Sequence, residues 1–364
     1  MADNEAAGDE VLGTPGGSPR RAGRLVGEPV AGRLRRIGRR GAPGQAFGGR
    51  SQWADVGGPV HYLDFGGPAR APAIVAVHGL GGSSVNWAAI APRLTIHYRL
   101  IAPDLGGFGL TRAGSRDVSV PGNRDLLHRF LETVPAVARK PVILMGNSMG
   151  GMISMLEASA APPGVAALIL VDPALPFAFA RPDPLVATVL LLFATPGLGG
   201  LMRGLRRSEP PEVRVARLLS LCCADAARVP EAMVAKHVEL ERRRTEFPDR
   251  EQAFNDAMRS LVYTVSRRGG QAYRAITDSV GCPVLLLHGD RDRLVPVAVA
   301  RAAARAHPGW TYTELPGVGH VPQLEVPDET ARLVLDWLAR LSAGPSTGHR
   351  ARRMWGRSSP AALT

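Results

Sequence analysis

A serine with a glycine two positions away on each side stands where a short apolar run meets a longer amphipathic segment. The sequence reads Gly-Asn-Ser-Met-Gly-Gly over residues 146–151, directly after the apolar run 142–145. A nucleophile presented on a tight turn between a strand and a helix needs neighbours with almost no side chain, which glycine supplies. On such a turn the Ser148 hydroxyl lies at a helix N-terminus, whose dipole favours developing negative charge. The pattern therefore predicts a nucleophilic serine.

A serine hydroxyl is a weak nucleophile unless a base takes its proton, and the base needs an acid that fixes its orientation. His320 lies in the glycine-flanked loop Leu-Pro-Gly-Val-Gly-His-Val-Pro (315–322), after an expected strand over residues 310–315. Imidazole is the side chain whose charge changes near neutral pH. This loop therefore offers a candidate general base.

Three aspartates are candidates for the acid. Asp290 and Asp292 lie in the loop that follows the apolar run 284–287, and Asp172 follows the run 167–171. Asp290 is closer to its strand, where it suits a structural pairing with a neighbouring arginine.

Short apolar runs alternate with amphipathic segments along the middle of the chain. The apolar runs lie at 73–77, 98–102, 142–145, 167–171 and 284–287. The amphipathic segments lie at 87–94, 124–138, 149–160, 297–306 and 328–341. Continuous apolar runs of four or five residues are typical of parallel strands that helices cover on both faces. The pattern predicts a doubly wound, mostly parallel α/β sheet, with its chemistry at the carboxyl ends of the strands.

The chain order serine, aspartate, histidine, with each residue after a strand, resembles the α/β-hydrolase superfamily over roughly residues 55–342. The resemblance implies that Ser148 is the nucleophile, His320 the base and Asp292 the acid. Asp172 stays open as an alternative acid, because some members of the superfamily place the acid at the corresponding strand end.

The same resemblance implies an oxyanion site made of two backbone N–H groups, those of Met149 and of Leu80 in His-Gly-Leu-Gly-Gly (78–82). It implies neither a metal nor an organic cofactor, and the sequence has no run of spaced metal ligands.

A long insertion separates the expected strands at 167–171 and 284–287. The resemblance implies that residues 173–282 form a helical cap between the two parts of the core, 51–172 and 283–342. Within the cap, residues 184–202 carry no charge. We expect an apolar lid over an acyl pocket; a membrane-facing lid and a true membrane span, which prolines and glycines would interrupt, are the alternatives.

The basic charge of the chain is concentrated at its ends. Of the net charge of +12, the segment 1–50 holds +4 and the segment 343–364 another +4, which leaves +4 for the body. The first segment is rich in Gly, Pro and Arg, and the second in Ser, Arg and Pro. Both are expected to be disordered, and nucleic acid is not an expected partner. No apolar signal segment follows the start, and only three cysteines are present, which favours a cytoplasmic protein. Arginine in place of lysine is typical of a GC-rich bacterial genome.

Together these features predict a serine hydrolase that cleaves a carboxylic ester of a mainly apolar small molecule. One alternative is carbon–carbon bond hydrolysis, because the segment 146–151 resembles the nucleophile turn of meta-cleavage-product hydrolases. That group commonly has Trp after its catalytic histidine, whereas Val321 stands here. The other alternative is a receptor that binds a small molecule on a hydrolase scaffold without catalysis.

Overall fold

The computed structural model describes residues 48–343 except 139, 177–183 and 185–208. Of the expected tails, 1–50 and 343–364, and of the uncharged stretch 184–202, only residues 48–50, 184 and 343 are described. The expectations for these three segments otherwise lie outside the described residues.

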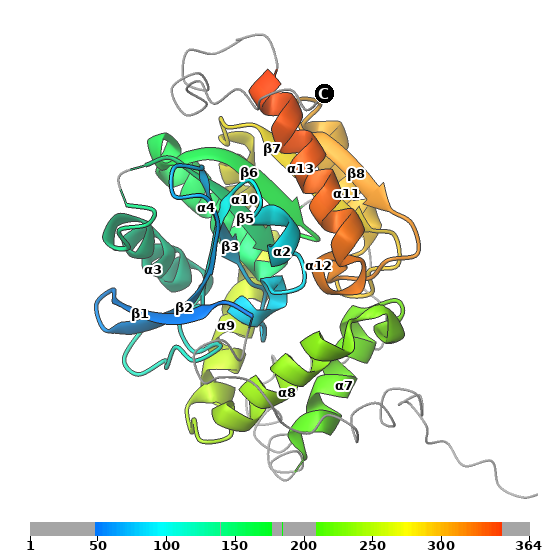
Figure 1. Ribbon diagram of the computed structural model, residues 1–364. Helices are drawn as coiled ribbons and strands as arrows, with labels where there is room; N and C mark the ends of the chain where they lie inside the picture. Colours follow the sequence, from blue (N-terminus) through cyan, green and yellow to red (C-terminus); the bar gives the residue numbers. More distant parts are fainter. Residues whose placement is uncertain (1–47, 139, 177–183, 185–208, 344–364) are drawn as a thin grey trace, which may run out of the picture.

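An eight-stranded sheet forms the centre of the molecule, in the spatial order β1-β2-β4-β3-β5-β6-β7-β8 (Figure 1). Its parallel part consists of β3 (Ala73–Val77), β4 (Arg99–Pro103), β5 (Val142–Asn147), β6 (Val165–Val171), β7 (Val284–Gly289) and β8 (Thr311–Leu315). All six strands were predicted from the sequence, and their ends differ from the prediction by at most two residues. The predicted mostly parallel sheet is confirmed.

An antiparallel hairpin of β1 (Arg50–Asp55) and β2 (Pro59–Gly66) extends the sheet beyond β4. The sequence pattern did not reveal it, because β2 mixes polar and apolar residues and has no continuous apolar run. Its turn contains Gly57 and Gly58, both with positive φ, the backbone conformation that tight hairpin turns require.

Helices and helical turns fill the segments between the strands. They are η1 (Ser84–Trp87), α2 (Ala91–Leu94), α3 (Val120–Thr133), α4 (Met149–Ala160), η2 (Pro162–Gly164), α7 (Pro211–Cys222), η3 (Ala226–Arg228), α8 (Glu231–Arg244), α9 (Arg250–Val265), α10 (Arg267–Asp278), α11 (Val297–Ala306), α12 (Pro322–Glu325) and α13 (Pro327–Ala343). The bounds of α4 and α11 match the prediction. The helix expected at 87–94 is instead two short turns, and the one expected at 124–138 begins at Val120 and ends at Thr133, just before Val134-Pro135.

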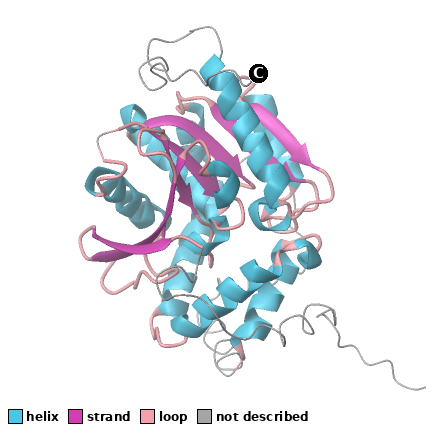
Figure 2. Cartoon of the chain, viewed as in Figure 1, coloured by secondary structure: helices cyan, strands magenta, loops and turns pink. Residues whose placement is uncertain are grey.

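The two faces of the sheet pack against different helices (Figure 2). Val75 and Val77 of β3 share a buried cluster with residues of α3, α4 and α11, whereas Ile74 and Ala76 share one with α2 and α13. Alternate residues of one strand therefore point to opposite helical layers, as a doubly wound sheet requires.

Helices α7 to α10 lie between β6 and β7 in the chain, within the range 173–282 that was expected to form a cap. α7 and α8 form their own buried cluster, which also holds Val321 and Leu324 from the segment after β8. By contrast, α10 contributes Tyr273 to the cluster of α3 and α4, and the Tyr273 hydroxyl donates a hydrogen bond to the carbonyl of Ala174. Among the helices of the described residues, none has the length and apolar character needed to cross a membrane.

Candidate active site

Ser148 occupies the turn between β5 and α4 in a conformation that L-residues seldom adopt, with φ 55° and ψ −119°. Steric contact with neighbouring backbone atoms requires glycine at both flanking positions, 146 and 150. A Cβ on Gly146 would lie 2.4 Å from the carbonyl oxygen of Gly150, and a Cβ on Gly150 would lie 2.2 Å from that of Val77. The backbone is thus packed too closely for any side chain at these two positions.

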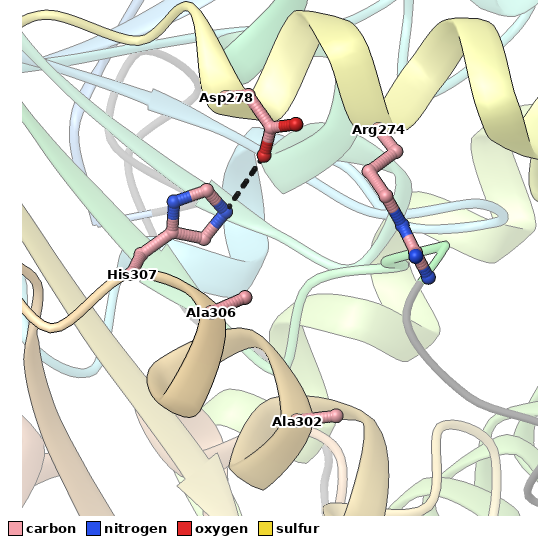
Figure 3. A pocket seen from close by; sticks show the side chains of 5 residues that line it. All are labelled: Arg274, Asp278, Ala302, Ala306 and His307. Carbon is pink, nitrogen blue, oxygen red and sulfur yellow. Dashed lines mark ion pairs between the residues drawn. The ribbon is translucent and has the colours of Figure 1, made fainter.

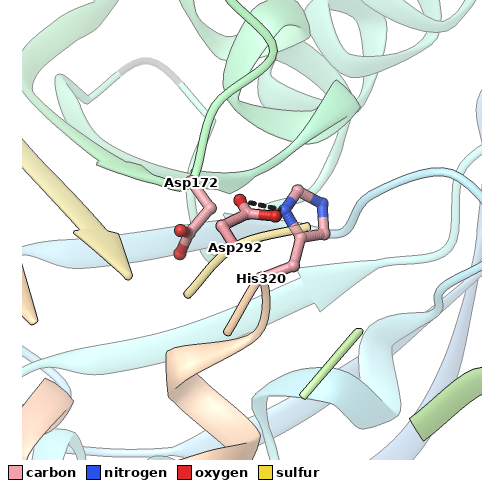
Figure 4. A group of neighbouring side chains, drawn as sticks. All are labelled: Asp172, Asp292 and His320. Carbon is pink, nitrogen blue, oxygen red and sulfur yellow. Dashed lines mark hydrogen bonds and ion pairs between the residues drawn. The ribbon is translucent and has the colours of Figure 1, made fainter. Parts of the chain in front are cut away.

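His320 and Asp292 form a buried, hydrogen-bonded pair (Figure 4). His320 Nδ1 lies 2.6 Å from Asp292 Oδ2, while Asp292 Oδ1 accepts hydrogen bonds from the backbone N–H groups of Leu294 and Val295. Burial alone would raise the pKa of Asp292, but the charge and hydrogen bond of His320 outweigh it and leave the pKa below its usual value. Asp290 accepts instead from the backbone N–H of Gly317 at 2.6 Å. Of the two acids in this loop, Asp292 is the one bonded to His320.

Asn147 links the serine turn to the histidine loop. Its side-chain Nδ2 donates to the carbonyl oxygens of Val171 and His320, each at 3.0 Å. The residue before Ser148 is therefore bonded directly to the backbone of His320. No hydrogen bond joins the half-buried Ser148 hydroxyl to any residue in the described part of the chain.

The glycine-rich turn after β3 lies against Ser148. A Cβ added to Gly79 would meet the Cβ of Ser148 at 3.0 Å. His78 holds the turn: its Nε2 accepts from the backbone N–H of Leu105, so its Nδ1 donates to the carbonyl of Gly79 at 2.8 Å. The backbone N–H of Leu80 thus belongs to a fixed turn beside the serine, while that of Met149 begins helix α4.

Asp172, Asp292 and His320 each have one potential metal-ligating atom within 4.8 Å of the other two (Figure 4). This is the one cluster of at least three such residues in the described ranges. Within this cluster, His320 Nδ1 and Asp292 Oδ2 lie 2.6 Å apart, which is the distance of a hydrogen bond. The donor set is used for hydrogen bonding within the protein.

A model of the alpha/beta hydrolase family matches residues 74–333, which include every candidate site residue named above. The chain belongs to the alpha/beta hydrolase family. It is an α/β-fold hydrolase, and its core has the fold that the sequence resemblance implied.

Three relatives of this hydrolase show the range of its family. Human monoacylglycerol lipase ABHD6 is 26% identical over 289 residues, which cover 77% of this chain and 81% of the relative. A 2-hydroxy-6-oxo-6-(2'-aminophenyl)hexa-2,4-dienoic acid hydrolase of Metapseudomonas resinovorans is 26% identical over 304 residues, covering 79% and 91%. Among solved structures, lip1 from Acinetobacter baumannii AYE superposes with a TM-score of 0.64 at 26% identity, covering 81% of this chain and 93% of that one.

Glu325 connects the segment after α7 to the loop of His320, a contact that sequence reasoning missed. Its buried carboxylate accepts hydrogen bonds from the backbone N–H groups of Gly319, Ala224 and Asp225, at 2.9, 3.1 and 2.9 Å. In addition, the N–H of His320 donates to the carbonyl of Cys222 at 2.6 Å. No motif marks Glu325 in the sequence, because two of its backbone donors lie 101 and 100 positions away and its ion pair with Arg228, at 3.6 Å, also joins distant segments.

An open pocket between α10 and α11 lies apart from these residues (Figure 3). Its lining consists of Arg274, Asp278, Ala302, Ala306 and His307. His307 forms an ion pair with Asp278 at 3.3 Å and stacks on Trp310. Since none of the candidate catalytic residues lines it, this pocket is not the candidate active site.

Proposed function

We propose that this hydrolase cleaves carboxylic esters of mainly apolar small molecules, with Ser148 as nucleophile, His320 as base and Asp292 as acid. The observation that carries the proposal is the buried, hydrogen-bonded pair of Asp292 and His320. The backbone carbonyl of His320 also accepts a hydrogen bond from Asn147, the residue before Ser148. Acyl transfer needs a base that is oriented by an acid and lies near the nucleophile, and the hydrogen bond from Asn147 to the His320 carbonyl supports that placement.

In the first step, His320 Nε2 takes the proton from Ser148 as Oγ attacks the ester carbonyl carbon. The imidazolium is stabilised by Asp292 across the 2.6 Å hydrogen bond. His320 then gives the proton to the departing alcohol, and an acyl-enzyme remains. A water molecule, deprotonated by the same imidazole, releases the acid and restores the serine. No step requires a metal or an organic cofactor.

The tetrahedral intermediates carry a negative oxygen, for which we propose the backbone N–H groups of Leu80 and Met149. Both N–H groups belong to segments packed tightly around Ser148, so they are held in place before the reaction and need no reorganisation during it. The loss of one such donor typically costs about 3 kcal/mol of transition-state stabilisation.

Apolar groups from the cap support an apolar substrate. Phe254 of α9 lies against the oxyanion turn, since a Cβ on Gly81 would meet its ring at 3.2 Å. Its neighbour Ala253 packs in the same way against Gly107. The relationship to monoacylglycerol lipase ABHD6 is consistent with an ester whose acyl chain contacts this surface.

Carbon–carbon bond hydrolysis is the second candidate, favoured by the relative from Metapseudomonas resinovorans named as a dienoic acid hydrolase. The same triad could serve that chemistry, so the substrate decides between the two. A panel of p-nitrophenyl esters of increasing acyl length, run beside a diketone dienoate, separates them by kcat/KM.

The variant Ser148→Ala distinguishes a serine hydrolase from a receptor that binds a small molecule without catalysis. We expect ester turnover to fall by several orders of magnitude, about 10⁴-fold or more, and labelling by a fluorophosphonate to disappear. Ser159→Ala, at an exposed site on the same helix, is the matched control and should leave both unchanged. Equal turnover in wild type and Ser148→Ala would contradict the role of Ser148, whereas turnover absent from both proteins would favour the receptor.

We also propose a cytoplasmic location. Cys222, Cys223 and Cys282 are free thiols in the structure, which suits a reducing compartment. Cell fractionation with an antibody to the native protein tests this point, and recovery in the membrane fraction would contradict it.

A further inference from the structure

Asp172, which follows strand β6, shares an unusual backbone conformation with Ser148. Its φ is 45°, and these two are the non-glycine residues with positive φ among those described. Because β5 and β6 are paired with Asn147 opposite Val171, the two strained turns are neighbours at the carboxyl edge of the sheet. Strain of this kind persists only where the surroundings impose it, and it concentrates at functional sites.

Two hydrogen bonds to β7 hold Asp172 in place. Its N–H donates to the carbonyl of Leu287 at 2.9 Å, and its Oδ1 accepts from the N–H of Gly289 at 2.8 Å. The carboxyl is fully buried, and its other oxygen, Oδ2, has no donor within the described ranges. A buried oxygen without a donor can be satisfied by carrying the proton itself and donating it.

The acceptor available for that proton is Asp292. The two carboxyl groups interact directly, within the cluster whose atoms lie inside 4.8 Å of one another. Asp292 already accepts from Leu294 and Val295 at one oxygen and from His320 at the other. These donors favour the ionised form of Asp292, whereas the oxygen of Asp172 that lacks a donor favours a proton on Asp172.

We propose that Asp172 is a positioning residue for the reaction, which keeps its proton and donates it in a hydrogen bond to Asp292, so that Asp292 stays oriented toward His320. This inference rests on the proposed function, because it assigns Asp172 a part in the same triad. The bond acts through Asp292 and does not require contact between Asp172 and the substrate.

The charged and titratable groups around Asp172 favour this assignment. His288 of β7 lies 3.7 Å from Asp172 and 3.5 Å from Asp292, but burial lowers its pKa and keeps it neutral. The remaining groups that face the pair are His320, Glu325 of α12 and the Cys222 thiol of α7, which faces Asp292. Burial and the charge of Asp292 raise the pKa of Asp172 well above its ordinary value.

The proposal has a consequence at alkaline pH. When Asp172 loses its proton, Asp292 loses a hydrogen-bond donor and faces a second negative charge. Like charges at this distance destabilise the arrangement that holds His320. Turnover should therefore decline at a pH set by Asp172.

Asp172→Asn and Asp172→Gly form a matched pair of variants. Asparagine adopts positive φ readily, can accept from Gly289 and can donate an N–H to Asp292, and it cannot ionise. Glycine tolerates the same backbone conformation but removes the side chain. Comparing the two variants separates the effect of the donated hydrogen bond from the effect of the backbone turn.

We would measure kcat and KM for a p-nitrophenyl ester from neutral to strongly alkaline pH, with the spontaneous hydrolysis subtracted. Asp172→Asn should stay within about twofold of wild type at neutral pH and keep its activity at alkaline pH where wild type declines. Asp172→Gly should lose about tenfold or more in kcat with a smaller change in KM. Proton NMR of the low-field Nδ1–H between His320 and Asp292 should show a shift in Asp172→Gly but little change in Asp172→Asn.

Any of three outcomes overturns the inference. Wild-type kcat and pH profile in Asp172→Gly would mean that Asp172 only forms the turn, and equal losses in both variants would mean that no donated hydrogen bond is involved. If Asp172→Gly does not fold, as judged by circular dichroism, an alkaline decline unchanged in Asp172→Asn is sufficient to refute it. If wild type hydrolyses no ester, the proposed function fails, while the NMR comparison still tests the Asp172–Asp292 bond.

Discussion

Glu325→Gln tests whether the segment after α7 helps to position His320, the proposed base. The wild-type carboxylate accepts three backbone N–H groups, two at Oε2 and one at Oε1. A glutamine amide has one accepting oxygen, so at least one N–H must face an NH₂ group instead. Leaving one buried donor without an acceptor costs about 1–3 kcal/mol. The free energy of unfolding should fall by about that amount.

The effect on catalysis should exceed what this loss of stability explains. Gly319, one of the donors, is bonded through the chain to His320, and a misplacement of about 1 Å at a catalytic group can cost roughly 10²-fold in rate. We expect kcat for a p-nitrophenyl ester to fall by about tenfold or more in Glu325→Gln, with a smaller change in KM.

Glu314→Gln is the control for this measurement. Glu314 pairs with Arg301 on the exposed side of β8, and breaking such a surface pair should cost less than about 1 kcal/mol and leave kcat unchanged. Urea unfolding and steady-state kinetics on both variants are sufficient. A destabilised Glu325→Gln enzyme with wild-type kcat would refute the view that Glu325 and the segment after α7 position His320.

Three further predictions concern other parts of the fold. Burial would raise the pKa of Asp104, but the hydrogen bond and charge of His61 outweigh it and lower this pKa from 3.8 to about 2. The ionised carboxylate of Asp104 therefore stabilises the fold above about pH 4. Asp104→Asn should therefore cost about 2 kcal/mol at neutral pH in urea unfolding, and the difference should narrow as the pH falls from 4 toward 2. Gly150→Ala should prevent folding or cost more than about 3 kcal/mol in the same assay, because its Cβ would overlap the carbonyl oxygen of Val77. Burial raises the pKa of the Cys222 thiol to about 12, so iodoacetamide should modify Cys222 slowly in folded protein and rapidly in urea, as measured by mass spectrometry.

Much of the fold could be predicted because its central strands obey a simple rule. Strands β3 to β7 are buried on both faces, so each reads as an apolar run, and the alternation with helices identifies the sheet. The β1–β2 hairpin could not be found in this way. Its strand β2 is fixed to the sheet partly by polar contacts such as that of His61 with Asp104, which lies just after β4 and 43 positions away.

The candidate site could be proposed from the sequence where chemistry restricts a single position, but not where the arrangement depends on packing. Gly146, Ser148 and Gly150 form a local pattern, and the loops of Asp292 and His320 follow strand ends. Glu325 acts on backbone N–H groups, whose direction depends on the tertiary structure alone. Asp172 was a candidate acid from its position at a strand end, but its burial beside Asp292 could not be deduced from spacing.

The hydrogen bond from Asn147 to the carbonyl of His320 spans 173 positions of the chain. During synthesis the serine turn leaves the ribosome long before the loop that holds His320, and at about 5–20 residues per second the chain needs several seconds or more to complete that interval. Under the proposed mechanism, the nascent chain therefore carries Ser148 without its proton acceptor until the loop of His320 has emerged. The proposed ester hydrolysis can begin only after that loop has folded against the serine turn.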